Sequence, residues 1–308
     1  MILENSENIY KHFFILKETY KGCVKEVVLG YGANSLRVGG ENGPAFHFFE
    51  GTWPNPPHFA LEVCDLEPTD WPVAVVERFK DVLDNPTKWA LEYIRNFGAE
   101  AICLQLTSTD PIEKDTSPEE AAALVRDVSE GIEVPLIVFG SGTADKDARV
   151  LTKVAEVCAG KSLFMGPVVR QNLEEIGKAA QAFGHGVIIQ TPLEIPMAKE
   201  LSIKLSKMLP SGKILLDPLS PALGYGMEYG YSVMERQKLA ALVVNDTDLQ
   251  MPLVANIGKE CWETKEARES EEQGVLWEAM TGLSYLLAGA NFLVLRHPKS
   301  HQVLKRIF

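Results

Sequence analysis

The sequence is poor in the residues that build metal centres. Its five cysteines are scattered, and no two of them stand in a C-x-x-C pair. Iron–sulfur clusters and structural zinc sites usually need thiolates at short spacing, so we expect neither on this chain. Cys64 and Cys103 fall inside predicted strands, where a small buried thiol is the ordinary interpretation.

Long apolar runs and positive net charge are also missing. No apolar run approaches the roughly 20 residues of a membrane span, and the first residues lack the basic-then-apolar order of a signal peptide. The net charge of -12 at pH 7 disfavours nucleic acid and anionic lipid as partners. We therefore expect a cytoplasmic protein that binds neither nucleic acid nor membranes.

What the sequence does contain is eight short apolar runs, each followed by a helical pattern. Such runs predict a parallel sheet that is buried on both faces. Eight of them in 308 residues predict a closed (β/α)8 barrel, or TIM barrel, whose sites lie on the loops after the strands. The runs are Phe59–Asp65, Ala101–Leu106, Pro135–Phe139, Ser162–Met165, Gly186–Gln190, Lys213–Asp217, Pro252–Asn256 and Asn291–Leu295.

A different pattern precedes the first of these runs. Residues 24–50 alternate short strand-like pieces with glycine-rich turns, which indicates antiparallel hairpins. Residues 53–58, WPNPPH, then form a stiff connector. We predict a small β cap and connector over residues 1–58 and a barrel over residues 59–308. The cap would close the amino-terminal end of the barrel or dock a partner, with Phe46, Phe48 and Phe49 buried in its packing.

The helical patterns fill the intervals between the strands. Ser117 and Pro118 give one helix a capping serine and an N1 proline. The last helix has room for only two or three turns, so Ile9–Leu16 is a candidate to help cover the barrel. The acidic run Glu263–Glu272 is interpreted as a solvated helix face, with a partner-docking surface as the alternative. The other helices are predicted over Pro86–Phe97, Asp145–Cys158, Asn172–Phe183, Pro196–Leu209, Ser232–Val244 and Val275–Leu287, the last two apolar enough to pack tightly.

The strand ends carry neutral polar residues rather than histidines or paired carboxylates. Amides, hydroxyls and backbone N–H groups suit a large neutral ligand with amide arms, and suit acid–base catalysis poorly. Their plain alternative is the ordinary role of loop and helix-cap residues. The segments are Thr107–Asp110, Gly140–Thr143, Gln190-Thr191, Asp217–Gly226, Asn256–Gly258 and Arg296-His297.

Two of these segments allow sharper hypotheses. Gly140–Thr143 could cradle a phosphate at a helix N-terminus, but it fails as a dinucleotide fingerprint because Asp145 stands where the third glycine belongs. A tight turn between strand and helix is the preferred interpretation. Asp217 and Asn256 end two strands and could hydrogen-bond a pterin ring, or could simply cap those strands.

At this point the sequence resembles a known family, the small subunit of the corrinoid/iron–sulfur protein, which is related to the delta subunit of the archaeal acetyl-CoA decarbonylase/synthase complex. The resemblance runs from the predicted cap to the carboxyl terminus, and its two longest motifs are specific. It is carried by Gly39–Asn42, Phe46–Gly51, Asp217-Pro218, Ala222–Tyr229, Glu235-Arg236, Gly258–Trp262, Lys265–Ala267 and Arg296–Pro298.

The resemblance implies a role in methyl transfer. Members pair with a large subunit that carries a [4Fe–4S] cluster and a mobile corrinoid domain, so the cluster is expected on the partner. The corrinoid, of the cobalamin type, lies between that domain and the top of the small subunit's barrel. It takes a methyl group from methyltetrahydrofolate on a separate methyltransferase and delivers it to acetyl-CoA synthase. Protein supplies position and access, while the cofactor does the chemistry.

We therefore predict a barrel subunit of a methyl-carrier complex that is not catalytic alone. One alternative is a pterin-binding methyltransferase with the same barrel, and another is a scaffold that never touches the corrinoid. The loop Leu219–Tyr229 is expected on the ligand face, where its glycines would let the backbone approach a flat ligand. The candidate corrinoid-binding residues are Thr107, Ser108, Thr109, Gly140, Ser141, Gln190, Thr191, Leu223, Gly224, Tyr225, Gly226, Asn256 and Arg296.

Overall fold

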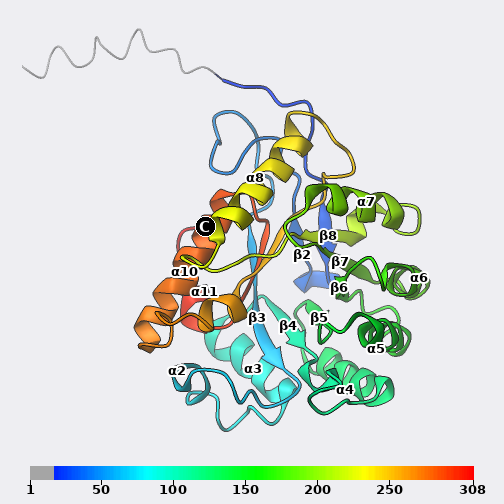
Figure 1. The fold of residues 1–308 in the computed structure, drawn as a ribbon, viewed down its shortest axis with the longest axis vertical. Helices are drawn as coiled ribbons and strands as arrows, with labels where there is room; N and C mark the ends of the chain where they lie inside the picture. Colours follow the sequence, from blue (N-terminus) through cyan, green and yellow to red (C-terminus); the bar gives the residue numbers. More distant parts are fainter. Residues whose placement is uncertain (1–16) are drawn as a thin grey trace, which may run out of the picture.

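The computed structural model describes residues 17–308, and its centre is a barrel (Figure 1). The barrel has eight parallel strands. The predicted helical stretch Ile9–Leu16 lies outside the described residues. Each strand pairs with the next in the order β8-β7-β6-β5-β4-β3-β10-β9, and a bridge between Leu216 and Leu253 closes the ring. The strands are β3 (His58–Cys64), β4 (Ala101–Gln105), β5 (Leu136–Phe139), β6 (Phe164–Val168), β7 (Gly186–Gln190), β8 (Ile214–Asp217), β9 (Val254–Asn256) and β10 (Phe292–Leu295).

Helices wrap the outside of this ring, which confirms the predicted TIM barrel. Ser117 begins one of them with a capping box: its side chain accepts a hydrogen bond from the Glu120 N–H, and the Glu120 carboxylate accepts one from the Ser117 N–H. The helices are α2 (Val73–Val76), α3 (Pro86–Phe97), α4 (Pro118–Gly131), α5 (Ala144–Val157), α6 (Leu173–Phe183), α7 (Ile195–Leu205), α8 (Met227–Leu242), α9 (Gly258–Trp262), α10 (Glu271–Leu287) and α11 (Pro298–Lys305).

Two sequence predictions about these elements need correction. Strand β6 begins two residues later than the predicted run Ser162–Met165 and ends three residues beyond it, at Val168. The acidic run Glu263–Glu272 is mostly turns between α9 and α10, not a helix face. The Ser270 side chain accepts a hydrogen bond from the Gln273 N–H and thereby starts α10 at Glu271.

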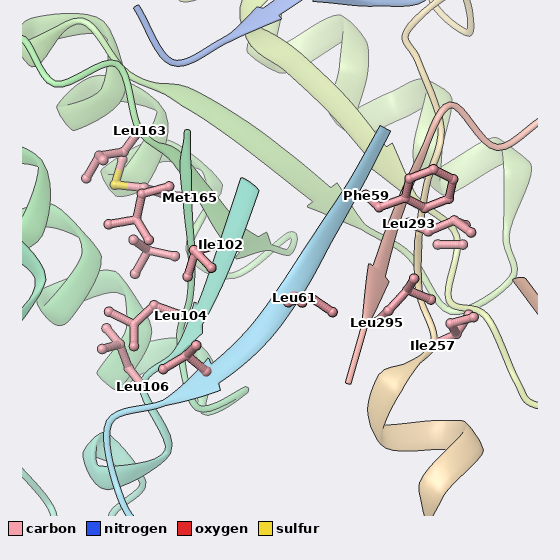
Figure 2. Close-up of a cluster of buried hydrophobic side chains, with 14 of the residues drawn as sticks. Phe59, Leu61, Ile102, Leu104, Leu106, Leu163, Met165, Ile257, Leu293 and Leu295 are labelled. Carbon is pink, nitrogen blue, oxygen red and sulfur yellow. The ribbon is translucent and has the colours of Figure 1, made fainter. Parts of the chain in front are cut away.

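Side chains alternate between the barrel interior and the helices because the side-chain period of a strand is two. The interior cluster is small and apolar, and it includes Ala60, Cys103, Ile137, Leu215 and Val294. The outer cluster joins the strands to the helices and is much larger. Figure 2 shows part of this outer layer, with Leu61 from β3, Leu104 from β4 and Leu295 from β10 drawn as sticks.

A two-stranded antiparallel hairpin closes the amino-terminal end of the barrel. It consists of β1 (Val27–Leu29) and β2 (Leu36–Val38). Val27, Leu29 and Val38 are buried in the same cluster as the interior strand residues, so the hairpin is the floor of the barrel core. This is one of the two positions expected for the predicted cap.

The segment after the hairpin differs from the prediction. Residues 45–50 form turns on the surface rather than a strand, with backbone hydrogen bonds from the His47 N–H to Pro44 and from the Glu50 N–H to His47. The Phe48 side chain is 64% exposed and that of Phe49 is 49% exposed. The prediction that Phe46, Phe48 and Phe49 are buried is therefore wrong for Phe48 and Phe49, and Phe46 is only half-buried. The segment forms turns, so no strand directs these side chains toward the core.

A buried ionic network fixes this amino-terminal segment to the barrel. The Glu41 carboxylate is fully buried and accepts hydrogen bonds from Lys238 Nζ at 2.5 Å and from Asn291 Nδ2 at 2.8 Å. Lys238 lies on α8, and Asn291 immediately precedes β10. Three segments that are far apart in sequence therefore meet at one carboxylate.

Candidate functional site

A cavity opens at the carboxyl end of the barrel, where the interior layers change from apolar to polar. Its volume is 580 Å³, within the range of roughly 300–1,000 Å³ that is typical of small-molecule pockets. Every second residue of a strand points into the barrel. In most strands, the inward residue that follows the apolar layer is polar. These inward polar residues are Glu62, Gln105, Gln190, Asp217, Asn256 and Arg296.

Arg296 forms the buried positive end of this layer. Its guanidinium donates to Glu62 from Nε at 2.7 Å and from Nη2 at 3.3 Å, and both side chains are almost fully buried. The Trp71 ring lies 3.9 Å from the guanidinium carbon and covers its flat face. Glu62 and Trp71 together hold the Arg296 side chain in place, so it forms a rigid part of the cavity wall.

Asp217 is the most perturbed acid on the cavity wall. It is 1% exposed, and its two oxygens accept hydrogen bonds from the Leu219 N–H at 2.9 Å and from Gln190 Nε2 at 3.0 Å. Burial raises its pKa from 3.8 to about 6, and the two hydrogen bonds oppose this shift. A carboxyl with this pKa can bind a ligand either as an acceptor or, when protonated, as a donor.

Two amides on the same wall remain available. The Asn256 side chain has no hydrogen-bond partner among residues 17–308. Gln105 makes only a 3.9 Å contact from Nε2 to the Cys103 sulfur. Both side chains line the cavity, where each can donate to and accept from a ligand amide.

Carboxylates from neighbouring elements brace the loops after β4 and β5. Asp65, which follows β3, holds the first loop, and Asp147 on α5 holds the second. Asp65 accepts hydrogen bonds from the hydroxyls of Thr107 and Ser108 and from the Ser108 N–H. Asp147 accepts from the N–H groups of Ser141 and Gly142, at 2.9 Å each. The phosphate-cradle hypothesis therefore fails, because the N–H groups that would hold a phosphate already bind Asp147.

The structure divides the predicted corrinoid-binding residues into two groups. Six line the cavity: Thr107, Gly140, Ser141, Gln190, Asn256 and Arg296. Seven do not: Ser108, Thr109, Thr191, Leu223, Gly224, Tyr225 and Gly226.

The distinctive segment Leu219–Tyr229 is divided by the structure. Its first residues, Leu219–Pro221, line the cavity, residues 222–226 lie outside it, and Met227–Tyr229 belong to α8. The Leu223 N–H donates to the Thr281 hydroxyl, and the Trp277 indole N–H donates to the Leu223 carbonyl, so the loop leans on α10. Gly224 and Gly226 have φ values of +78° and +102°. Glycine adopts this left-handed backbone conformation more readily than other residues do. The turn itself therefore accounts for both glycines, and no ligand is needed to explain them.

Sequence reasoning missed the acidic character of the mouth. Glu62 and Gln105 were hidden inside apolar runs, although the period of two marks both as inward-facing. Of the other carboxylates, Asp110 ends a segment that the strand-end pattern identified, and the rest lie in the loop after β3, in the loop after β4 and on α9, where that pattern did not reach. Among the described residues that line the cavity, Lys259 is the one basic residue besides Arg296. These other carboxylates are Glu67, Asp70, Asp110, Glu113 and Glu260.

Neither a metal cluster nor a membrane helix is found among the residues that the structure describes. In the part of the chain that the structure describes, no three His, Cys, Asp or Glu side chains converge into a group able to hold a metal ion. Among the helices of residues 17–308, none combines the length and apolarity needed to cross a bilayer.

Comparison with known sequences gives a consistent result. The family model described as CO dehydrogenase/acetyl-CoA synthase delta subunit matches residues 26–307. The acetyl-CoA decarbonylase/synthase complex subunit delta of Archaeoglobus fulgidus is 36% identical over 98% of this chain and 72% of its own length. The subunit of the same name from Methanosarcina mazei is 36% identical over 90% of this chain. The chain spans 66% of that relative's length.

Solved structures with a similar fold are dihydropteroate synthases. The enzyme from Xanthomonas albilineans has a TM-score of 0.58 and 14% identity, covering 83% of this chain and 94% of that one. The enzyme from Stenotrophomonas maltophilia has a TM-score of 0.57 and 13% identity, covering 86% and 97%. At this identity the likeness concerns the fold alone.

Proposed function

Because the chain belongs to the family of CO dehydrogenase/acetyl-CoA synthase delta subunits, we propose that it is the barrel subunit of a methyl-carrier complex and that its cavity mouth faces a corrinoid. Its relatives are named as subunits of a complex, so the chain has partner subunits. In this proposal the nearest partner is the large subunit, which carries the [4Fe–4S] cluster and the corrinoid domain. When bound, the corrinoid supplies the cobalt chemistry that moves a methyl group from methyltetrahydrofolate, on its methyltransferase, to acetyl-CoA synthase.

The observation that carries this proposal is the pair of available amides at the mouth. Asn256 and Gln105 line the cavity, and neither side chain is satisfied by a strong hydrogen bond within residues 17–308. A corrinoid is ringed by acetamide and propionamide groups, which pair with such side chains. It is far larger than a 580 Å³ cavity, so its amide arms would enter while the ring covers the mouth.

The carboxylates around the mouth suit the same ligand. Asp110, Glu113 and Glu260 line the cavity, and only Lys259 and Arg296 oppose them. Carboxylates accept hydrogen bonds from amide N–H₂ groups. They also disfavour an anionic ligand at the mouth. The contribution of this chain is therefore to bind and orient the cofactor rather than to transfer protons.

This proposal is tested on the complex, by replacing amides at the mouth and measuring corrinoid content. Asn256→Leu and Gln105→Leu together should lower the corrinoid absorbance per complex, while Asn96→Leu, which changes an exposed amide on α3, should not. Normal corrinoid content in the double variant, with intact partner subunits, would show that the mouth does not contact the cofactor.

A second candidate function is favoured by Asp217. This buried carboxyl, which lines the same cavity as the Asn256 amide, can accept the two N–H groups on the pyrimidine edge of a pterin. The chain would then bind methyltetrahydrofolate itself and act as a methyltransferase. Calorimetric titration of the purified chain with methyltetrahydrofolate distinguishes the two functions, because the corrinoid-facing subunit should show no binding.

A further inference from the structure

Helix α10 presents an apolar face to solvent. Leu276, Met280 and Leu287 are 48%, 50% and 46% exposed, and Leu283 lies between them half-buried. Spacings of four, three and four residues place these side chains in one stripe along the helix. From Leu276 to the end of α10, the only charged residue is Glu278, and it is fully buried on the opposite face.

The helices on the opposite flank of the barrel are different. Helices α4, α5 and α6 lie across the barrel from α10 (Figure 1). The exposed positions of α5 include Asp145, Arg149 and Glu156, and those of α6 include Glu174 and Lys178. This is the charged outer face expected of a helix that covers a barrel in water. The apolar stripe on α10 is therefore a local property of one flank, not of the fold.

An acidic segment adjoins the start of this stripe. Residues 263–272 contain five glutamates against one lysine and one arginine. Glu269 and Glu272 are exposed, and neither forms an ion pair within residues 17–308. Glu272 precedes Leu276 by one helical turn, so the carboxylates and the stripe form one continuous surface, which we call the α10 surface.

We propose that the α10 surface docks a helix of another subunit of the complex, one that carries its own apolar stripe and lysine or arginine residues beside it. The alternating four- and three-residue spacing is that of the a and d positions through which two helices interlock. The partner's basic residues would lie against Glu269 and Glu272. A second copy of this chain is a poorer occupant, because each copy carries a net charge of -12 and two copies repel.

The first test places a charge in the stripe. The full chain carrying Met280→Glu is produced together with the other subunits of its complex, and the partner subunits retained on it are quantified. Ile203→Glu is the matched control, because Ile203 is a 39% exposed apolar residue on α7. We expect at least tenfold weaker association for Met280→Glu and none of that loss for Ile203→Glu. Equal retention by a folded Met280→Glu chain would overturn the proposal.

The second test does not depend on how the substitution affects folding. A photoreactive amino acid at position 280 of the chain, within the assembled complex, should cross-link to a helix of a different subunit. Cross-linking to a second copy of this chain, or no cross-linking in an intact complex, would overturn the proposal.

The third test concerns the charges. Glu269→Lys with Glu272→Lys should weaken association at low salt and reduce its dependence on salt. Association that is unchanged by both reversals would show that the partner does not bring basic residues to this surface.

Discussion

Replacing Asp217 by asparagine should stabilise the isolated chain at neutral pH. Burial raises the pKa of Asp217 from 3.8 to about 6, so the folded chain holds a proton there between these values and the unfolded chain does not. A raised pKa gives stability that is fully present below pH 3.8 and is lost as the pH rises through 6. Two pKa units correspond to about 3 kcal/mol, which is the largest penalty that the ionised form can impose.

Asparagine keeps the shape of the side chain and removes the ionisation. Its oxygen can still accept the hydrogen bond from the Leu219 N–H. Gln190, which now donates to the Asp217 carboxylate, can turn its amide and present its oxygen to the new N–H₂ group. The geometry therefore allows most of the 3 kcal/mol to appear as a gain in the free energy of unfolding.

Urea unfolding of the wild-type and Asp217→Asn chains, at steps from pH 4 to pH 8, measures this gain. The difference between them should be near zero at pH 4 and grow to about 3 kcal/mol at pH 8. Asp65→Asn is a useful comparison, because burial also raises the pKa of Asp65 but its carboxylate accepts three hydrogen bonds from Thr107 and Ser108, so we expect its replacement to destabilise the chain. A difference for Asp217→Asn that does not grow with pH would refute the reasoning.

Three further predictions concern stability elsewhere in the chain. Lys238→Met should cost about 3–5 kcal/mol in chemical denaturation because it leaves the Glu41 carboxylate buried without its cation, and adding Glu41→Gln should recover part of the loss. Burial lowers the pKa of His301 to about 4, so this histidine alone contributes a loss of up to about 3 kcal/mol of stability as the pH falls from 6.5 to 4. His301→Leu should flatten that part of the pH profile, and an unchanged profile would contradict this. Phe48→Ala should change the unfolding midpoint little, because the ring is 64% exposed; a loss of several kcal/mol would mean that the ring is covered in solution.

The barrel could be predicted because parallel strands buried on both faces leave a strong local signal. The first of the predicted runs, Phe59–Asp65, overlaps β3 except for one residue at each end. The turn segment around Phe48 could not be predicted in the same way. Its aromatic residues satisfy a strand pattern, and only the surface position of that segment shows that no core faces it.

The site was harder to predict than the fold because its polar residues belong to two different kinds of position. Gln190, Asp217 and Asn256 end their strands and could be identified directly. Glu62 sits inside β3, and its role follows only from pairing β3 with β10, which brings it beside Arg296. Such a pairing between the first and last strands is long-range, so no local pattern contains it.

The two loops predicted to bind ligand illustrate a general point about this mouth. Asp65 and Asp147 satisfy the hydroxyl and N–H groups of the loops after β4 and β5, so those loops are rigid and have few donors left. The strand ends differ, because they keep groups that are free to bind a ligand: the Asn256 amide has no hydrogen-bond partner among residues 17–308. A half-buried amide without a partner on a rigid strand costs little conformational entropy when it meets a ligand. Ligand discrimination should therefore depend on the inward layer of strand residues, and loop substitutions such as Ser141→Ala should alter stability more than binding.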